Sequence, residues 1–323
     1  MKENSKKIDI LNPIDQMSLF GYKKYFNTLN ILYKKNILPN AILLTGPKGI
    51  GKSTFAYHFI NYLLSQSEDK NYSIENYSIN HENKSYQLLK SFIHPNFHLI
   101  DNFEDEQIKI DQIRNFLKFN NKSAYSKNLK LVLLDNAEFL NTNSANALLK
   151  VLEEPSNNTF FFIIHNSNTK ILNTIISRCI QFKINFNIAE KKEIFENLIK
   201  HYNFNYSEND FNNYACYETP GNILKLFSVF QYYNINNSKD SLDNILFLID
   251  IYKNSNDHNF LNYISFLIED FYKNLSLNNN NMSLYYNKNK ISNLIHNTKK
   301  YNLDKKNLLI SITRILKNEY SFS

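Results

Sequence analysis

The clearest chemical pattern is Gly46-Pro-Lys-Gly-Ile-Gly51-Lys52-Ser53, which fits the phosphate-loop pattern G-x-x-x-x-G-K-S/T. Glycines in such a loop let backbone N–H groups surround phosphate oxygens, while Lys52 reaches the β- and γ-phosphates and Ser53 ligates Mg²⁺. Three of the five glycines lie in this loop, which favours a phosphate site over a βα turn with an incidental lysine. The residues predicted to bind a nucleotide here are Gly46, Gly49, Gly51, Lys52, Ser53 and Thr54.

A second group of residues bears on hydrolysis. Asp135 follows the apolar run 131–134, where P-loop ATPases place the carboxylate that holds Mg²⁺, so we predict that Ser53 and Asp135 share the metal ion. The next residue is Asn136, whose amide can orient a water molecule but cannot accept its proton. Glu138 could substitute, although an exposed or helix-capping carboxylate is the simpler interpretation. We therefore expect slow or absent hydrolysis.

Predicted strands and helices alternate along the part of the chain that must position these residues. Five short apolar runs predict strands at 41–45, 97–101, 131–135, 160–164 and 180–184, and their near-continuous apolar character favours burial on both faces of a parallel sheet. Helical spacing lies between them at 54–64, 110–119 and 144–152. This alternation predicts an α/β fold.

Beyond about residue 186 only helical patterns follow, beginning with 189–202 and 223–230 and continuing from 242 onward. We predict an α/β nucleotide-binding domain (1–185), a small helical lid domain (186–235) and an all-α C-terminal domain (236–323). The polar stretch 235–241 is the expected hinge, and 278–281 is an expected loop.

Composition excludes several classes of protein. A net charge of +7 and a pI near 9.0 raise nucleic acid as a partner, but the abundance of Asn, Lys, Ile, Tyr and Phe indicates a general compositional bias. Two cysteines exclude a disulfide framework and a four-cysteine zinc site. There is no apolar stretch of signal-peptide or membrane-spanning length, so we expect a soluble, cytoplasmic protein with no membrane partner.

Two further segments carry a family resemblance: Ser144-Ala-Asn-Ala-Leu-Leu-Lys-Val-Leu-Glu-Glu-Pro155, and Ser177-Arg178-Cys179 after the fourth predicted strand. Together with the phosphate loop they resemble the clamp-loader branch of the AAA+ ATPases, whose nucleotide-binding domain is RecA-like. Within that branch the chain is similar to the delta-prime subunits of bacterial DNA polymerase III. The resemblance covers residues 10–185 and continues in Thr219-Pro-Gly-Asn222.

The resemblance implies a role in DNA replication. Arg178 would be an arginine finger, supplied in trans to the nucleotide of a neighbouring motor subunit. His165 and Asn166 both stand where a side chain would contact the γ-phosphate, and we favour Asn166. The cofactor would be ATP with Mg²⁺. The C-terminal domain would form the collar of a heteropentamer with gamma/tau motor and delta subunits, which loads the sliding clamp on primed DNA. DNA-directed DNA polymerase activity would belong to the complex.

Departures from the family pattern refine this hypothesis. Residues 65–96 contain no cysteine, so we predict no zinc module, and Asn222 stands where active clamp-loader ATPases place a sensor arginine. These features favour a nucleotide-binding partner of the motor. The alternatives are a turnover-competent AAA+ ATPase, either the motor subunit or another remodelling enzyme, and a DNA-binding module. In the motif helix Lys150, Glu153 and Glu154 are interpreted as solvated charges rather than interface charges, and Cys179 as a small packed residue.

Overall fold

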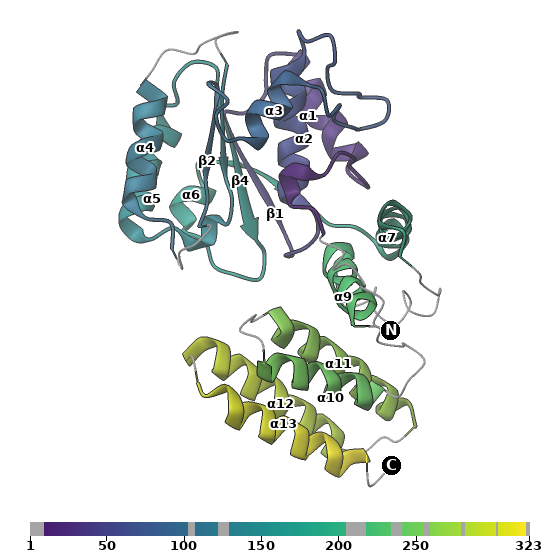
Figure 1. Ribbon diagram of the computed structural model, residues 1–323. Coiled ribbons are helices and arrows are strands. Elements are labelled where there is room, and N and C mark those ends of the chain that lie inside the picture. Colours follow the sequence, from purple (N-terminus) through teal and green to yellow (C-terminus); the bar gives the residue numbers. More distant parts are fainter. Residues whose placement is uncertain are drawn as a thin grey trace. The chain divides into compact units, whose positions relative to one another are not determined.

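The structure is a computed structural model that describes residues 10–102, 107–121, 129–204, 218–233, 241–254, 259–278, 282–301 and 303–320. These residues fall into two compact units (Figure 1). The first contains residues 10–204 and 218–225, and the second begins at Leu226. The predicted three-domain division stays a prediction, and the expected hinge at 235–241 lies outside the described residues except for Ser241, which begins helix α10.

The first unit is built on a parallel sheet with the strand order β2-β3-β4-β1-β5. All five predicted strands are confirmed. The expectation that every strand is buried on both faces is wrong for β5, where Ile180 is 54% exposed because β5 lies at the edge of the sheet. The strands are β1 (Ala41–Gly46), β2 (Phe97–Ile100), β3 (Lys130–Leu134), β4 (Thr159–Asn166) and β5 (Ile180–Lys183).

Helices cover both faces of this sheet (Figure 1). Alternate side chains of a strand point to opposite faces, so Ile42 and Leu44 pack in one core cluster and Leu43 in the other. The first cluster includes helices α1 (Lys23–Lys34), α2 (Lys52–Ser65) and α3 (Lys84–Lys90). The second includes α4 (Ile110–Asn121), α5 (Thr142–Glu153) and α6 (Asn173–Ile176). The predicted α/β class is thus confirmed.

The ends of helix α5 follow from its sequence. The side chain of Asn141 accepts a hydrogen bond from the Ser144 backbone N–H (2.8 Å), which caps the first turn. The helix ends at Glu153, two residues before Pro155, because the residue before a proline is disfavoured in the helical region. These two signals place Glu153 in the last helical position.

The second unit is all-helical in its described part. Apolar residues at helical spacing, among them Ile245, Ile264, Ile291 and Ile312, meet in one core cluster. Helix α11 continues to Asn278, and the rest of the expected loop at 278–281 lies outside the described residues. The helices are α10 (Ser241–Asn254), α11 (Asn259–Asn278), α12 (Met282–Tyr301) and α13 (Lys305–Tyr320). None of the described helices has the length and apolar character needed to cross a membrane.

Aromatic stacking and polar contacts hold the segment between α2 and α3, where the sequence predicts no zinc module. The ring of Tyr72 stacks on Phe26, with centroids 5.3 Å apart. Asn83 donates to the Lys70 carbonyl (2.8 Å), and its side-chain oxygen caps α3. Within the described ranges, no group of three or more His, Cys, Asp or Glu side chains could hold a metal ion. The absence of zinc stays a prediction.

We predict that His58, which is fully buried in α2, makes this protein acid-sensitive. Its Nε2 donates to the Gln16 carbonyl (3.0 Å), and its Nδ1 accepts from the Tyr72 hydroxyl (3.1 Å). Burial lowers the pKa of His58 to about 3. The unfolded chain therefore binds more protons between the ordinary histidine pKa and that value, and stability falls as the pH falls through this window. At pH 5 the loss is roughly 2 kcal/mol relative to pH 7.

Urea unfolding of the wild type and of His58→Gln at pH 7 and pH 5 measures this loss. The variant should lose less stability than the wild type on acidification, because it lacks the titrating group. An equal loss in both proteins would contradict the assignment.

Candidate functional site

The phosphate loop joins β1 to α2 at the carboxyl edge of the sheet. Gly51, the N-cap residue of α2, has φ +100°, a backbone conformation that L side chains rarely adopt. Lys52 is 6% exposed, and its Nζ donates to the carbonyls of Gly46 (2.8 Å) and Pro47 (2.9 Å). The ammonium group therefore lies within the loop, beside the free N–H groups at the start of α2.

Ser53 and Asp135 meet as predicted. The Ser53 hydroxyl donates to Asp135 Oδ2 (2.7 Å), and Asp135 directly follows β3. Burial raises the pKa of Asp135 to about 6, an effect that the hydrogen bond from Ser53 opposes. Burial lowers the pKa of Lys52 to about 8, while the charge of Asp135 opposes that shift. A hydroxyl and a carboxylate in contact are oxygen ligands of the kind that Mg²⁺ takes at nucleotide sites.

Asn136 is anchored to the end of the neighbouring strand β2. Its Nδ2 donates to Asp101 Oδ1 (2.9 Å) and to Asn102 Oδ1 (3.1 Å), and its backbone has φ +56°. Both amide N–H groups thus bond to groups that follow β2. The position after Asp135 therefore holds a fixed neutral amide with no proton-accepting group.

Asn166 ends β4 and pairs in register with Gly46 of β1, so it lies next to the phosphate loop. Its side-chain oxygen accepts from the Asn168 backbone N–H (3.2 Å). The Asn166 backbone N–H donates to Glu138 Oε2 (3.2 Å). Glu138 is half-buried, so the simpler interpretation of it as an exposed or helix-capping carboxylate is incomplete. It holds the end of β4 beside the loop.

The segment Thr219-Pro-Gly-Asn222, where helix α9 (Pro220–Tyr232) begins, packs on the outer half of the phosphate loop. Thr219 Oγ1 donates to the Lys48 carbonyl (2.9 Å), and the Gly221 backbone N–H donates to the Gly49 carbonyl (3.1 Å). A Cβ at Gly221 would lie 2.5 Å from that carbonyl oxygen. We call these two hydrogen bonds the α9 clasp. Only a glycine allows this approach of α9 to the loop.

A cavity of about 480 Å³ lies beside the loop. Two of the predicted site residues, Gly46 and Arg178, do not line this cavity. The Gly46 carbonyl instead accepts a hydrogen bond from Lys52. The sequence did not indicate the apolar side of the cavity, formed by Leu19, Phe20, Tyr22, Ile194 and Leu198, nor the contribution of Lys225. The predicted residues that line the cavity are Gly49, Gly51, Lys52, Ser53, Thr54, Asp135 and Asn166.

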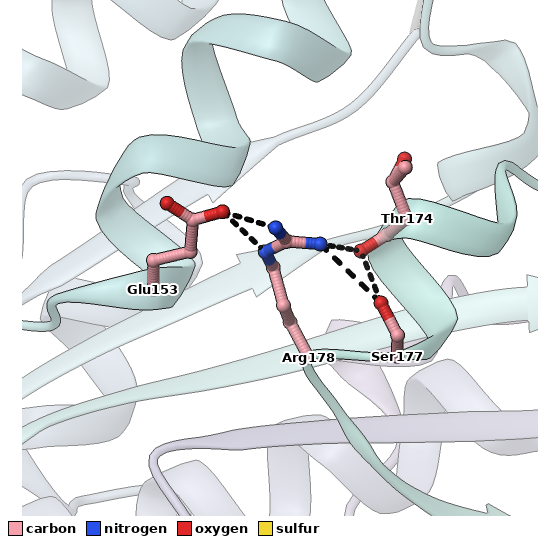
Figure 2. A network of polar contacts seen from close by, with 4 residues as sticks. All are labelled: Glu153, Thr174, Ser177 and Arg178. Carbon is pink, nitrogen blue, oxygen red and sulfur yellow. Dashed lines mark hydrogen bonds and ion pairs between the residues drawn. The ribbon is translucent and has the colours of Figure 1, made fainter.

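Arg178 lies at a different place, in the turn after α6. Its Nε (2.7 Å) and Nη2 donate to Glu153 Oε1, and its Nη1 donates to the Thr174 carbonyl (2.8 Å) and to Ser177 Oγ (3.3 Å), as Figure 2 shows. Glu153 is 49% exposed, as expected for a solvated charge, and its carboxylate in addition binds Arg178. Burial raises the pKa of the neighbouring Cys179 thiol to about 11, which agrees with a packed residue rather than a nucleophile.

The phosphate loop between β1 and α2, with Asp135 after β3, defines the P-loop class of α/β nucleotide-binding domains. Residues 21–187, more than half of the chain, match the protein family described as DNA polymerase III, delta subunit. The chain belongs to this family.

The chain is similar to DNA polymerase III subunit delta' of Pseudomonas aeruginosa (40% identity over 44% of this chain and 42% of the relative). It is also similar to the Escherichia coli subunit of the same name (28% identity, 48% and 45%). The chain thus spans about half the length of the curated relatives it matches. A DNA polymerase III gamma subunit-related protein of Thermotoga maritima is similar in structure, with a TM-score of 0.49, 17% identity, and coverage of 90% of this chain and 97% of that chain. The predicted resemblance to delta-prime subunits is confirmed.

We predict that Gly221→Ala weakens nucleotide binding. The added methyl group would displace the Gly49 carbonyl and with it the outer half of the phosphate loop. Overpacking of this kind costs about 1–3 kcal/mol, and each 1.4 kcal/mol lost from binding is tenfold in affinity, so the affinity for ATP should fall by about tenfold or more. Calorimetric titration with ATP and Mg²⁺ measures this change.

Thr219→Val provides a second measurement, since it removes a donor to the loop without adding bulk. It should weaken binding to a smaller extent. Unchanged affinity in both variants, with unchanged thermal unfolding, would show that the α9 clasp has no part in binding.

Proposed function

We propose that this protein is a delta-prime type subunit of a DNA polymerase III clamp loader. In this proposal it binds ATP with Mg²⁺, supplies Arg178 in trans to a neighbouring motor subunit, and joins gamma/tau and delta subunits in a heteropentamer. The complex loads the sliding clamp on primed DNA during replication. The observation that carries the proposal is Arg178, which lies at the surface of a phosphate-loop domain yet does not line that domain's own cavity.

Several features support nucleotide binding by this chain. Lys52 offers a buried cation, Ser53 and Asp135 offer two oxygen ligands for Mg²⁺, and the loop ends at the N-terminus of α2, where backbone N–H groups favour a phosphate. The apolar side of the cavity, which includes Leu19 and Phe20, suits an adenine ring. When bound, ATP with Mg²⁺ would supply the phosphoryl charge that these residues neutralise.

The same site favours binding over turnover. General-base activation of water needs a group that accepts a proton, and Asn136 is an amide held by Asp101 and Asn102. Asn222, at the position of a sensor arginine in active relatives, donates to Glu218 (2.8 Å). These contacts favour the partner role over the alternative of a turnover-competent motor ATPase or another remodelling enzyme.

The composition of the chain supports a special role for Arg178. Arginine is rare here, with three arginines among 37 Lys and Arg residues, yet one stands in Ser177-Arg178-Cys179. A guanidinium binds phosphate with two parallel N–H groups and stabilises charge on a transferring phosphoryl group, which an ammonium group does less well. The guanidinium at this position fits an arginine finger.

Lys52→Ala should abolish nucleotide binding by this chain, since it removes the buried cation from the loop. Binding of a fluorescent ATP analogue measures this effect, with Lys24→Ala, an exposed lysine of α1, as the control. Clamp loading by the reconstituted complex should decline less than binding does. A collapse of loading, as for a motor subunit, would favour the alternative function.

Arg178→Ala should leave nucleotide binding by this chain unchanged and lower the steady-state ATPase of the reconstituted complex. At the nucleotide site that Arg178 contacts, the expected reduction is about 10³-fold, the lower end of the range for loss of an arginine finger. Arg114→Ala, in an exposed ion pair with Asp111, is the matched control. Unchanged ATPase of the complex would refute the trans role.

A further inference from the structure

The guanidinium of Arg178 is saturated almost completely by its own chain (Figure 2). The Nε–H and one Nη2–H donate to Glu153, and Nη1 donates to Thr174 and Ser177. An arginine has five N–H donors, so only the second Nη2–H is left. The side chain is 30% exposed, which leaves it within reach of another molecule.

This arrangement is incompatible with a two-point grip on a phosphate. Bidentate binding uses two parallel N–H groups on one edge of the guanidinium. Glu153 occupies the edge formed by Nε and Nη2, and Thr174 with Ser177 occupies Nη1. A phosphate that takes two N–H groups must therefore replace at least one of these acceptors.

Glu153 is the acceptor that can be exchanged. Its side chain is 49% exposed, so water can solvate the carboxylate when the arginine leaves, and exposed ion pairs contribute little to stability. The Thr174 carbonyl is part of helix α6 and cannot turn away in the same manner. A carboxylate and a phosphate each offer a pair of anionic oxygens that the guanidinium fork can bind.

We propose that Glu153 holds Arg178 folded back on its own chain and competes with the neighbour's phosphate for the same N–H groups. Arg178 then reaches the neighbouring site only after it has left Glu153. This inference rests on the trans role proposed above and adds a positioning residue that sets when the arginine is available.

Chemical labelling of the isolated full chain tests the contact itself. Phenylglyoxal modification, followed by peptide mass spectrometry, gives a rate for each arginine, with Arg114 and Arg314 as internal references. In Glu153→Gln the rate at Arg178 should rise by about two- to fivefold, the factor expected for release from a partly exposed ion pair. Glu154→Gln, the exposed neighbour, should leave the rate unchanged. An unchanged rate in Glu153→Gln would overturn the proposal.

The ATPase of the reconstituted complex tests the competition. Glu153→Gln should raise it by about two- to fivefold when clamp and primed DNA are present, and Glu154→Gln should not. The double variant with Arg178→Ala should behave like Arg178→Ala alone. A fall in Glu153→Gln would mean that the carboxylate aims the arginine rather than withholding it, which overturns the proposal.

The two failures can be told apart. If Arg178→Ala has no effect on the complex, the trans role fails, and competition with a neighbour's phosphate fails with it. If Arg178→Ala lowers the ATPase while Glu153→Gln changes neither labelling nor ATPase, the trans role stands and the hold by Glu153 is refuted.

Discussion

The parallel pairing of β4 with β1 on one side and β3 on the other is the constraint on which the candidate site depends. This pairing sets Asn166 beside Gly46 and places Asp135, which follows β3, at the same edge of the sheet. A slip of one residue would turn each apolar side chain to the wrong face, so burial on both faces holds the register. The core therefore sets where the phosphate loop begins and which side chains lie beside it.

Features encoded by local sequence were predictable. The phosphate loop is contiguous, so its residues could be named with their roles, and β3 could be recognised because its apolar run ends at Asp135. Strand burial was less predictable, since the order of strands is a tertiary property. The run at 180–184 looks like that of a central strand, yet β5 lies at the edge and exposes Ile180. Composition alone cannot distinguish the two positions.

Contacts between distant segments that no known motif links were beyond reach from the sequence. The carbonyls of Lys48 and Gly49 are ordinary backbone groups, and nothing local indicates that Thr219 and Gly221 bind them. Glu153 and Glu154 are likewise adjacent residues of the same type, and the sequence alone does not distinguish their roles. They differ because Glu153 is the last helical residue of α5 and contacts Arg178, whereas Glu154 follows the helix. The distinction arises from where the helix ends.

The two cations singled out in this chain differ in a way that matches their surroundings. Lys52 is a compact charge that fits inside a tight loop and bonds to two carbonyls on one side. Arg178 instead spans the ends of two helices, since its planar fork can bond to Glu153 on one edge and to Thr174 on another. A lysine carries its three N–H donors on a single nitrogen, so it has no separate edges to present to Glu153 and to Thr174. In a chain where lysine is the usual basic residue, an arginine at this position is therefore explained by geometry rather than by charge.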